Sequence, residues 1–206
     1  MEVIKNMSDY IFVFDLDSTI TKKEILPMIA EVIHKEKEMS ELTEATMRGE
    51  VSFEQSFLQR VDILKEISIL DIKKMVKNIP LNNHIVDFMR QHSERCFIIT
   101  GNIDIWIEDL IVELGMKEHT YCSKANCIGN KLTQVVNIVN KELVAKQFIQ
   151  PLVVIGDGAN DSGMAKVADI SIGYGGVREI APALLQVVDY AFYDEKECVD
   201  FLYSLI

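Results

Sequence analysis

The stretch Ile11-Phe-Val-Phe-Asp15-Leu-Asp17-Ser-Thr19-Ile20 decides the fold. Its first four residues are apolar and either β-branched or aromatic, which predicts a short strand buried on both faces. Two acids separated by one residue, Asp15 and Asp17, follow directly. In an open α/β sheet, ligands and chemistry gather just beyond the carboxyl ends of the strands. Two carboxylates at such a place repel each other unless a cation or a proton lies between them, although Asp and Ser are also common in ordinary turns.

The composition is that of a globular protein without a basic surface. The chain has 206 residues, of which 49% are hydrophobic and 26% charged, and this fits one domain with a small insert. A formal net charge of −11 argues against nucleic-acid and anionic-membrane partners, which need basic surfaces. Small phosphorylated ligands are not excluded, because they respond to local charge. The apolar runs of the sequence are far shorter than the roughly 20 residues of a membrane span.

Two further features favour a cytoplasmic protein. Residues 1–9 lack the basic and apolar segments of a secretory signal. The four cysteines, Cys96, Cys122, Cys127 and Cys198, are scattered and lack the spacing of a zinc site, which favours reduced thiols. We therefore expect a cytoplasmic protein that is a monomer or a homodimer.

Helical periodicity dominates the chain after this first strand. Ser52 and Gln55 have the spacing of a capping box, and Pro80 ends the last helix of the series. The first helix is expected to place Val32 and Ile33 on its apolar face. The four expected helices lie at 25–33, 40–48, 53–64 and 69–79.

Strand and helix signals alternate from Leu81 onward. The expected strands lie at 96–99, 152–155, 170–172 and 189–192, and the expected helices lie near 85–89, from 103 to 114, from Lys141 onward and near 199–205. A weaker alternation around Gly129-Asn130 predicts a hairpin within 119–139. This order predicts an α/β protein with a doubly wound parallel sheet and a Rossmann-like core. The core would comprise residues 1–21 and 80–206, and an inserted α-helical cap would comprise residues 22–79.

Three of the expected strands end in polar residues whose chemistry is complementary. Asp15 and Asp17 follow the first strand, Thr100-Gly101 ends the second, and Asp157 and Asp161 follow a third. Because the carboxyl ends of parallel strands share one edge of the sheet, these side chains can converge. Several oxygen donors at one place suit Mg²⁺, which keeps water and phosphate among its ligands. The neighbouring glycines allow backbone amides to approach an anion closely.

These motifs resemble those of the haloacid dehalogenase superfamily, and most closely its phosphoserine phosphatase branch. The matching segments are Asp15-Leu-Asp17-Ser-Thr19, Thr100-Gly101, Lys141 and Gly156-Asp-Gly-Ala-Asn-Asp161. The resemblance spans nearly the whole chain, including the place of the helical insert. It implies a phosphatase in which Asp15 is the nucleophile and Asp17 is the general acid and base. Cleavage of a carbon–halogen bond needs no second acid, so Asp17 favours phosphate chemistry.

The resemblance also implies a Mg²⁺ site. Asp15, Asp157 and the backbone carbonyl of Asp17 would bind the ion, and Asp161 would support them. A carboxylate can attack phosphorus only when the charges of both groups are neutralised, which the ion would help to do. The resulting aspartyl-phosphate divides one difficult step into two easier ones. Acidic neighbours would raise the pKa of Asp17, as proton donation to the leaving group requires.

The phosphate group would lie between the second motif and a lysine. The resemblance implies that Thr100 and Lys141 hold the phosphoryl oxygens, and it places Gly101 and Asn160 in the substrate pocket. Lys141 has an alternative interpretation as a solvated lysine at a helix start, and Lys146 is the other candidate. A helix N-terminus disfavours a cation, so a lysine there indicates a nearby anion, and Lys141 is preferred.

The expected cap contributes the residues that would recognise the leaving group. Glu24, Met47, Phe53 and Arg60 are of the types that the phosphoserine phosphatase branch has at matching positions. The resemblance implies that Glu24 binds the substrate ammonium, that Arg60 binds its carboxylate, and that Met47 and Phe53 close over the site. From the residues alone, Arg60 would instead pair with a glutamate of the cap, and Glu24 would be an ordinary acid at a helix start.

One position departs from the pattern of the branch. Asn102 stands where the branch usually has a second glycine, which leaves the substrate open. We expect a Mg²⁺-dependent phosphomonoesterase that acts on phosphoserine or a similar small phosphorylated metabolite. The alternatives are a phosphatase or phosphotransferase for another small metabolite and, from a different class, a non-catalytic phosphate-binding protein. Retention of the three motif acids Asp15, Asp17 and Asp157 together with Lys141 argues against the last.

Overall fold

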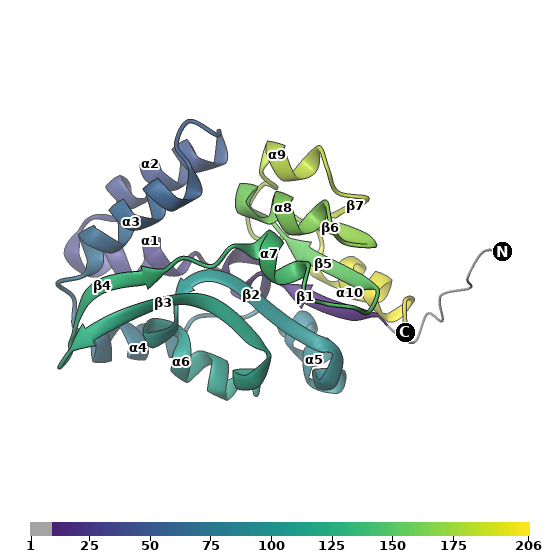
Figure 1. Ribbon diagram of the computed structural model, residues 1–206, viewed down its shortest axis with the longest axis horizontal. Coiled ribbons are helices and arrows are strands. Elements are labelled where there is room, and N and C mark those ends of the chain that lie inside the picture. The colour runs from purple at the N-terminus through teal and green to yellow at the C-terminus, as the bar shows by residue number, and fades with distance from the viewer. Residues whose placement is uncertain (1–9) are drawn as a thin grey trace.

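A seven-stranded sheet forms the centre of the computed structural model, which describes residues 10–206. The strand order is β4-β3-β2-β1-β5-β6-β7, and every neighbouring pair is parallel except β3 and β4 (Figure 1). The strands are β1 (Ile11–Phe14), β2 (Cys96–Ile103), β3 (Thr120–Ile128), β4 (Lys131–Asn137), β5 (Leu152–Gly156), β6 (Ile170–Tyr174) and β7 (Tyr190–Phe192). The predicted α/β class with a mostly parallel sheet is confirmed, and so is the hairpin, which turns at Gly129 with a positive φ of 58°.

Helices cover both faces of this sheet. In Figure 1, α7, α8 and α9 lie on one side of the strands, and α5, α6 and α10 lie on the other. The helices are α1 (Ile25–Ala30), α2 (Glu36–Met47), α3 (Phe53–Leu64), α4 (Ile69–Lys77), α5 (Asn83–Gln91), α6 (Asp104–Glu113), α7 (Lys141–Ala145), α8 (Ser162–Ala165), α9 (Pro182–Leu185) and α10 (Glu195–Tyr203).

Strand β1 is central because its residues are buried on both faces. Phe12 and Phe14 belong to the larger apolar cluster, where the ring of Phe12 packs edge-on against that of Phe88 with 5.1 Å between centroids. Ile11 and Val13 belong to a second cluster on the opposite face. The alternation of side chains along a strand explains why an unbroken apolar run is needed here. β1 also lies between β2 and β5, so its carboxyl end is flanked by theirs.

Four helices, α1 to α4, lie between β1 and β2 along the chain. The chain enters and leaves this insert side by side, because Thr21 forms an antiparallel bridge with Leu81 and the Lys22 N–H donates to the Pro80 carbonyl at 2.7 Å. Helices α1 to α3 pack together over the carboxyl edge of the sheet (Figure 1). The boundaries of a separate cap at 22–79 stay a prediction.

The last helix of the insert, α4, packs against α6 of the core. The Lys73 ammonium lies 2.6 Å from the Glu108 carboxylate across that contact. The start of α4 is also held by the hairpin, because the Leu70 N–H donates to Asn130 Oδ1 at 2.9 Å. α4 is therefore joined to the core, whereas α1, α2 and α3 cover the edge of the sheet.

The structure corrects three details of the predicted elements. The first helix ends at Ala30 and continues only as a tight turn, so Val32 and Ile33 are exposed rather than part of an apolar face. The second helix starts at Glu36 instead of residue 40, because acids suited to a first helical turn precede the apolar residues. Strand β2 runs on to Ile103 with a shift in register after Thr100, so the second motif lies inside the strand.

Three other expectations from the sequence concern membrane spans, the cysteines and a secretory signal. In residues 10–206, no helix is both long and apolar enough to cross a membrane. All four cysteines are free thiols, as expected, and Cys96 and Cys198 are buried. The expected lack of a secretory signal concerns residues 1–9, which lie outside the described part of the chain.

Candidate active site

Three strand ends meet at one point on the edge of the sheet. β1 pairs with β2 on one side and with β5 on the other, and Phe14 lies opposite both Ile98 and Ile155. The Asp15 N–H donates to the Ile155 carbonyl at 2.9 Å, which continues the ladder by one residue. Asp157, which follows β5, is therefore brought beside Asp15, as the sequence predicts.

A buried cluster of carboxylates occupies this point. Oxygen atoms of Asp15, Asp157 and Asp161 all lie within 4.8 Å of one another. Burial, which disfavours the charged form, raises the pKa of Asp15 to about 7 and the pKa of Asp157 well above its ordinary value. Asp157 Oδ1 is buried and has no hydrogen-bond partner. Three converging carboxylates, one with an orphaned oxygen, fit a hard divalent cation.

The loop after β5 holds the third acid of this cluster. Asp161 Oδ2 accepts hydrogen bonds from the backbone N–H groups of Asp157 at 3.1 Å and Gly158 at 2.9 Å. The fit depends on glycine, because a Cβ at Gly156 would lie 2.4 Å from Asp161 Oδ2. The motif at 156–161 is thus explained by the Asp161 side chain, which folds back under the loop that carries it. Asp161 stabilises the loop that positions Asp157.

A buried lysine neutralises part of this charge. Lys141 Nζ lies 2.7 Å from Asp15 Oδ1 and 2.6 Å from Asp161 Oδ1, and its side chain is 3% exposed. It is the first residue of α7, whose N-terminus is capped by Asn140 Oδ1 accepting from the Leu143 N–H at 3.0 Å. Lys146, the alternative from the sequence, is exposed and pairs with Glu142 on the same helix. Only Lys141 of these two lysines reaches the cluster.

Asp17 lies beside the cluster without joining it. Its Oδ1 accepts from the Ile25 N–H at 2.9 Å, and its Oδ2 accepts from Asn102 Nδ2 at 2.6 Å. Burial raises the pKa of Asp17, and these two hydrogen bonds lower it in part. Asn102 also donates its backbone N–H to Thr100 Oγ1 at 3.2 Å. The residue that departs from the family pattern therefore holds one oxygen of Asp17, a contact that was not predicted from the sequence.

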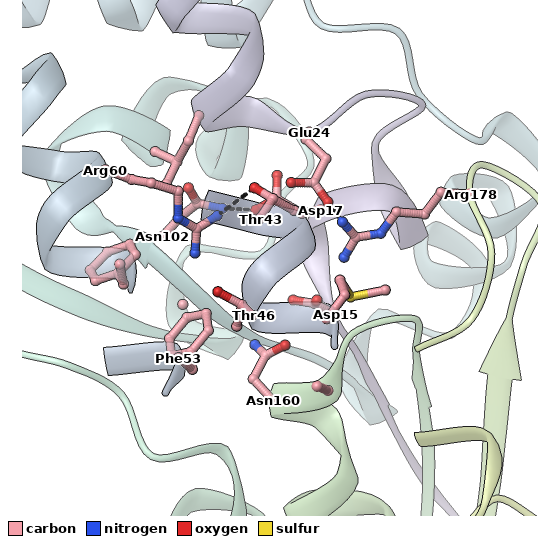
Figure 2. A pocket seen from close by; sticks show the side chains of 15 residues that line it. Asp15, Asp17, Glu24, Thr43, Thr46, Phe53, Arg60, Asn102, Asn160 and Arg178 are labelled. Carbon is pink, nitrogen blue, oxygen red and sulfur yellow. Dashed lines mark hydrogen bonds and ion pairs between the residues drawn. The ribbon is translucent and has the colours of Figure 1, made fainter. Parts of the chain in front are cut away.

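Helix α3 supplies a buried cation to the pocket. Arg60 donates from Nη1 to Thr43 Oγ1 at 3.1 Å and from Nε to the Ser56 carbonyl at 3.4 Å, and it is 6% exposed (Figure 2). Within residues 10–206, no carboxylate lies within ion-pair distance of Arg60. The cap glutamate considered from the sequence is thus not its partner. Burial lowers the pKa of Arg60 to about 10, so the guanidinium stays charged at neutral pH.

Phe53 closes one wall of the pocket. Its ring stacks on that of Phe57 with 5.6 Å between centroids and lies over the backbone of Gly101. A Cβ at position 101 would lie 2.4 Å from Phe53 Cζ, so any larger residue there would displace the ring from this position. The pocket is lined by residues of α1 to α3 and of the three strand ends: Asp15, Asp17, Glu24, Leu26, Thr43, Thr46, Met47, Phe53, Phe57, Arg60, Gly101, Asn102, Ala159, Asn160 and Arg178.

The pocket contains one charged residue that the sequence interpretation missed. Arg178, in the segment after β6, forms ion pairs with Glu24 and with Asp157 Oδ2. Figure 2 shows it entering from the side opposite to Arg60. The rule that located the acids, polar residues just beyond a strand end, applies equally to β6. Arg178 lies four residues after Tyr174, the last residue of β6.

Four residues that the resemblance implied do not line the pocket surface themselves: Thr100, Lys141, Asp157 and Asp161. All four are buried. The structure therefore brings together every residue that the resemblance implied, on two levels. The buried level holds the lysine, the hydroxyl and two of the acids, and the open level holds the side chains that would face a leaving group.

Comparisons with known proteins agree with this arrangement. A family model described as haloacid dehalogenase-like hydrolase matches residues 11–169. A phosphoserine phosphatase from Methanocaldococcus jannaschii is 27% identical over 179 residues, which cover 80% of this chain and 84% of that protein. One from Idiomarina loihiensis is 27% identical over 198 residues, covering 89% of this chain and 88% of the relative. The resemblance predicted from the motifs is confirmed.

A solved structure extends the likeness to three dimensions. It is a phospho-aspartyl intermediate analogue of phosphoserine phosphatase, with a TM-score of 0.80 and 25% sequence identity. The match covers 94% of this chain and 98% of that one. The sheet and the helical insert are therefore shared as one arrangement.

Proposed function

The chain belongs to the haloacid dehalogenase-like hydrolases, and we propose that it is a Mg²⁺-dependent phosphatase that acts through an aspartyl-phosphate on Asp15. Its substrate is phosphoserine or a similar small phosphate ester that carries a carboxylate. The observation that carries this proposal is the contact of Lys141 with both Asp15 and Asp161 beside the orphaned oxygen of Asp157.

The donor set fits a magnesium ion. Asp15, Asp157 and the backbone carbonyl of Asp17 would hold it, and Asp161 would support the loop that carries Asp157. When bound, the ion would neutralise charge on the phosphoryl oxygens and on the attacking carboxylate. The three buried acids have two cationic partners, Lys141 and Arg178, and Arg178 is shared with Glu24. The remaining excess of negative charge favours a cation.

The protein groups then account for the two chemical steps. A carboxylate oxygen of Asp15 forms a bond to phosphorus while the bond from phosphorus to the leaving oxygen breaks, and Asp17 gives that oxygen its proton. In the second step Asp17 takes a proton from water, the water oxygen bonds to phosphorus, and Asp15 is released with inorganic phosphate. Thr100 and Lys141 hold the phosphoryl oxygens in both steps.

The raised pKa of Asp17 supports its part in this scheme. Burial keeps the carboxyl protonated to a higher pH than in water, which favours its role as a proton donor. Its hydrogen bond to Asn102 fixes the orientation of the carboxyl group and limits how far the pKa rises. Asn102 is therefore a positioning residue for Asp17.

Arg60 supports the carboxylate-bearing substrate. A buried guanidinium without an acidic partner in the described residues is unfavourable unless a ligand supplies the anion. A phosphatase for an uncharged alcohol would not need it. The expectations of a cytoplasmic location and of a monomer or homodimer remain predictions.

The test is a screen of phosphorylated metabolites with Mg²⁺, scored by release of inorganic phosphate. We expect the highest kcat/KM among small esters that carry a carboxylate two or three bonds from the ester oxygen. Equal activity toward sugar phosphates and nucleotides would contradict the proposed substrate class, and phosphate transfer to an added alcohol would favour a phosphotransferase.

A further inference from the structure

Arg178 changes the charge pattern that the family resemblance implied for the pocket. Its Nη1 forms an ion pair with Glu24, and its Nε donates to Asp157 Oδ2. Glu24 lies at the N-terminus of α1, where its side chain makes no capping hydrogen bond and is free to face the pocket. The carboxylate expected to bind a substrate ammonium therefore already has a cation of the protein beside it.

We infer that Arg178 is a specificity-determining residue, which holds Glu24 in an ion pair and so directs the pocket toward phosphate esters with a carboxylate and no ammonium group. The substrate class is that of small phosphorylated hydroxy acids. This inference rests on the proposed function and narrows it, because phosphoserine carries both a carboxylate and an ammonium.

Among the described residues, the pocket offers an ammonium no carboxylate that lacks a partner. Three acids line it, and each already has a partner. Asp15 is paired with Lys141, Asp17 accepts the two N–H donors described above, and Glu24 is paired with Arg178. An ammonium brought to Glu24 would also lie close to the guanidinium, and like charges that are brought together in a site oppose binding.

A carboxylate, in contrast, finds a cation without an acidic partner in the described residues, Arg60. Arg60 and Arg178 enter the pocket from opposite sides in Figure 2, and both line it. Arg60 has no acidic partner in the described part of the chain, so it can bind a carboxylate without breaking an ion pair. With Glu24 held by Arg178, the unpaired guanidinium of Arg60 favours a leaving group that carries a carboxylate.

Arg178 is anchored well enough to keep this position. It is held from the insert side by Glu24 and from the core side by Asp157, and its side chain is 26% exposed. Its contact uses Asp157 Oδ2, whereas Oδ1 of the same carboxylate is the orphaned oxygen of the proposed cation site. The arginine and a cation can therefore share Asp157.

The experiment compares two ligands that cannot be hydrolysed. One is the phosphonate analogue of phosphoserine, in which a methylene group replaces the ester oxygen, and the other is the same molecule without its amino group. Each is titrated calorimetrically into the Mg²⁺-loaded wild type and into Arg178→Met, which removes the charge and keeps much of the volume. Arg178→Lys retains the charge, and Arg90→Ala is the control, because Arg90 is exposed on α5, pairs with Asp87 and does not line the pocket.

We expect the wild type to bind the ligand without the amino group about tenfold more tightly or better, since juxtaposed like charges cost several kcal/mol. Arg178→Met should lose this preference or reverse it, and Arg178→Lys and Arg90→Ala should keep it. Equal or tighter binding of the amino ligand by the wild type would overturn the inference, and so would an unchanged ratio in Arg178→Met. Failure of both ligands to bind would also overturn the inference. Turnover of p-nitrophenyl phosphate would then show separately whether the proposed phosphatase activity stands.

Discussion

Replacement of Arg60 by alanine separates recognition of the leaving group from phosphate chemistry. Arg60 is 6% exposed and has only neutral hydrogen-bond partners, Thr43 and the Ser56 carbonyl. A substrate carboxylate that binds it would lose its counter-charge in Arg60→Ala. Truncating one partner of a buried charge pair costs roughly 2–5 kcal/mol, which corresponds to a fall in kcat/KM of roughly 30- to 4,000-fold.

The assay uses two substrates with the same phosphate group. The preferred carboxylate-bearing ester should lose activity by the factor above, and p-nitrophenyl phosphate, which has no carboxylate, should lose far less. Thermal unfolding shows whether the variant still folds. Arg60 forms no ion pair in the described structure, and its removal relieves the burial of a charge. We expect the melting temperature to stay the same or rise. An equal loss on both substrates, or a large fall in melting temperature, would show that Arg60 braces α3 instead of binding substrate.

Three other predictions address the acids and the metal. Asp15→Asn should abolish turnover with the fold intact, since an amide is a poor nucleophile, and substantial residual activity by phosphate release would refute the covalent route. EDTA should remove activity and Mg²⁺ restore it, whereas Ca²⁺ should inhibit because it takes more oxygen ligands and would engage both oxygens of Asp15; full activity in chelator would disprove the metal site. Asn102→Gly should raise the pKa of Asp17, because the lost hydrogen bond lowers that pKa. As Asp17 donates a proton, the alkaline limb of the kcat/KM profile should move to higher pH, and a shift to lower pH would contradict its role as the acid.

Much of the fold could be predicted from residue patterns because strong local signals agree with the tertiary structure. The apolar run of β1 is buried on both faces, and Ser52 caps α3 by accepting from the Gln55 N–H at 3.2 Å. The hairpin at Gly129 and the helix end at Gly115 both have the positive φ that favours glycine. Where a helix ends before its apolar pattern does, as α1 does at Ala30, the pattern fails.

The acids were predictable for a related reason, whereas Lys141 was implied by the family resemblance and by its place at a helix start. Strand ends in a parallel sheet converge by topology, so a sequence that places acids there already specifies their proximity. Contacts between side chains from separate loops have no such rule. The bond from Asn102 to Asp17 depends on a shift in strand register, and the pairing of Arg178 with Glu24 depends on where the segment after β6 lies relative to α1.

The most direct measurement is a crystal structure of the Mg²⁺-loaded protein with beryllium trifluoride, which mimics a phosphoryl group bonded to a carboxylate. We expect beryllium to be bonded to a carboxylate oxygen of Asp15, with its fluorine atoms facing Lys141 Nζ and Thr100 Oγ1. Beryllium bonded to any other residue, or fluoride beside Asp15 with no bond to it, would contradict Asp15 as the nucleophile.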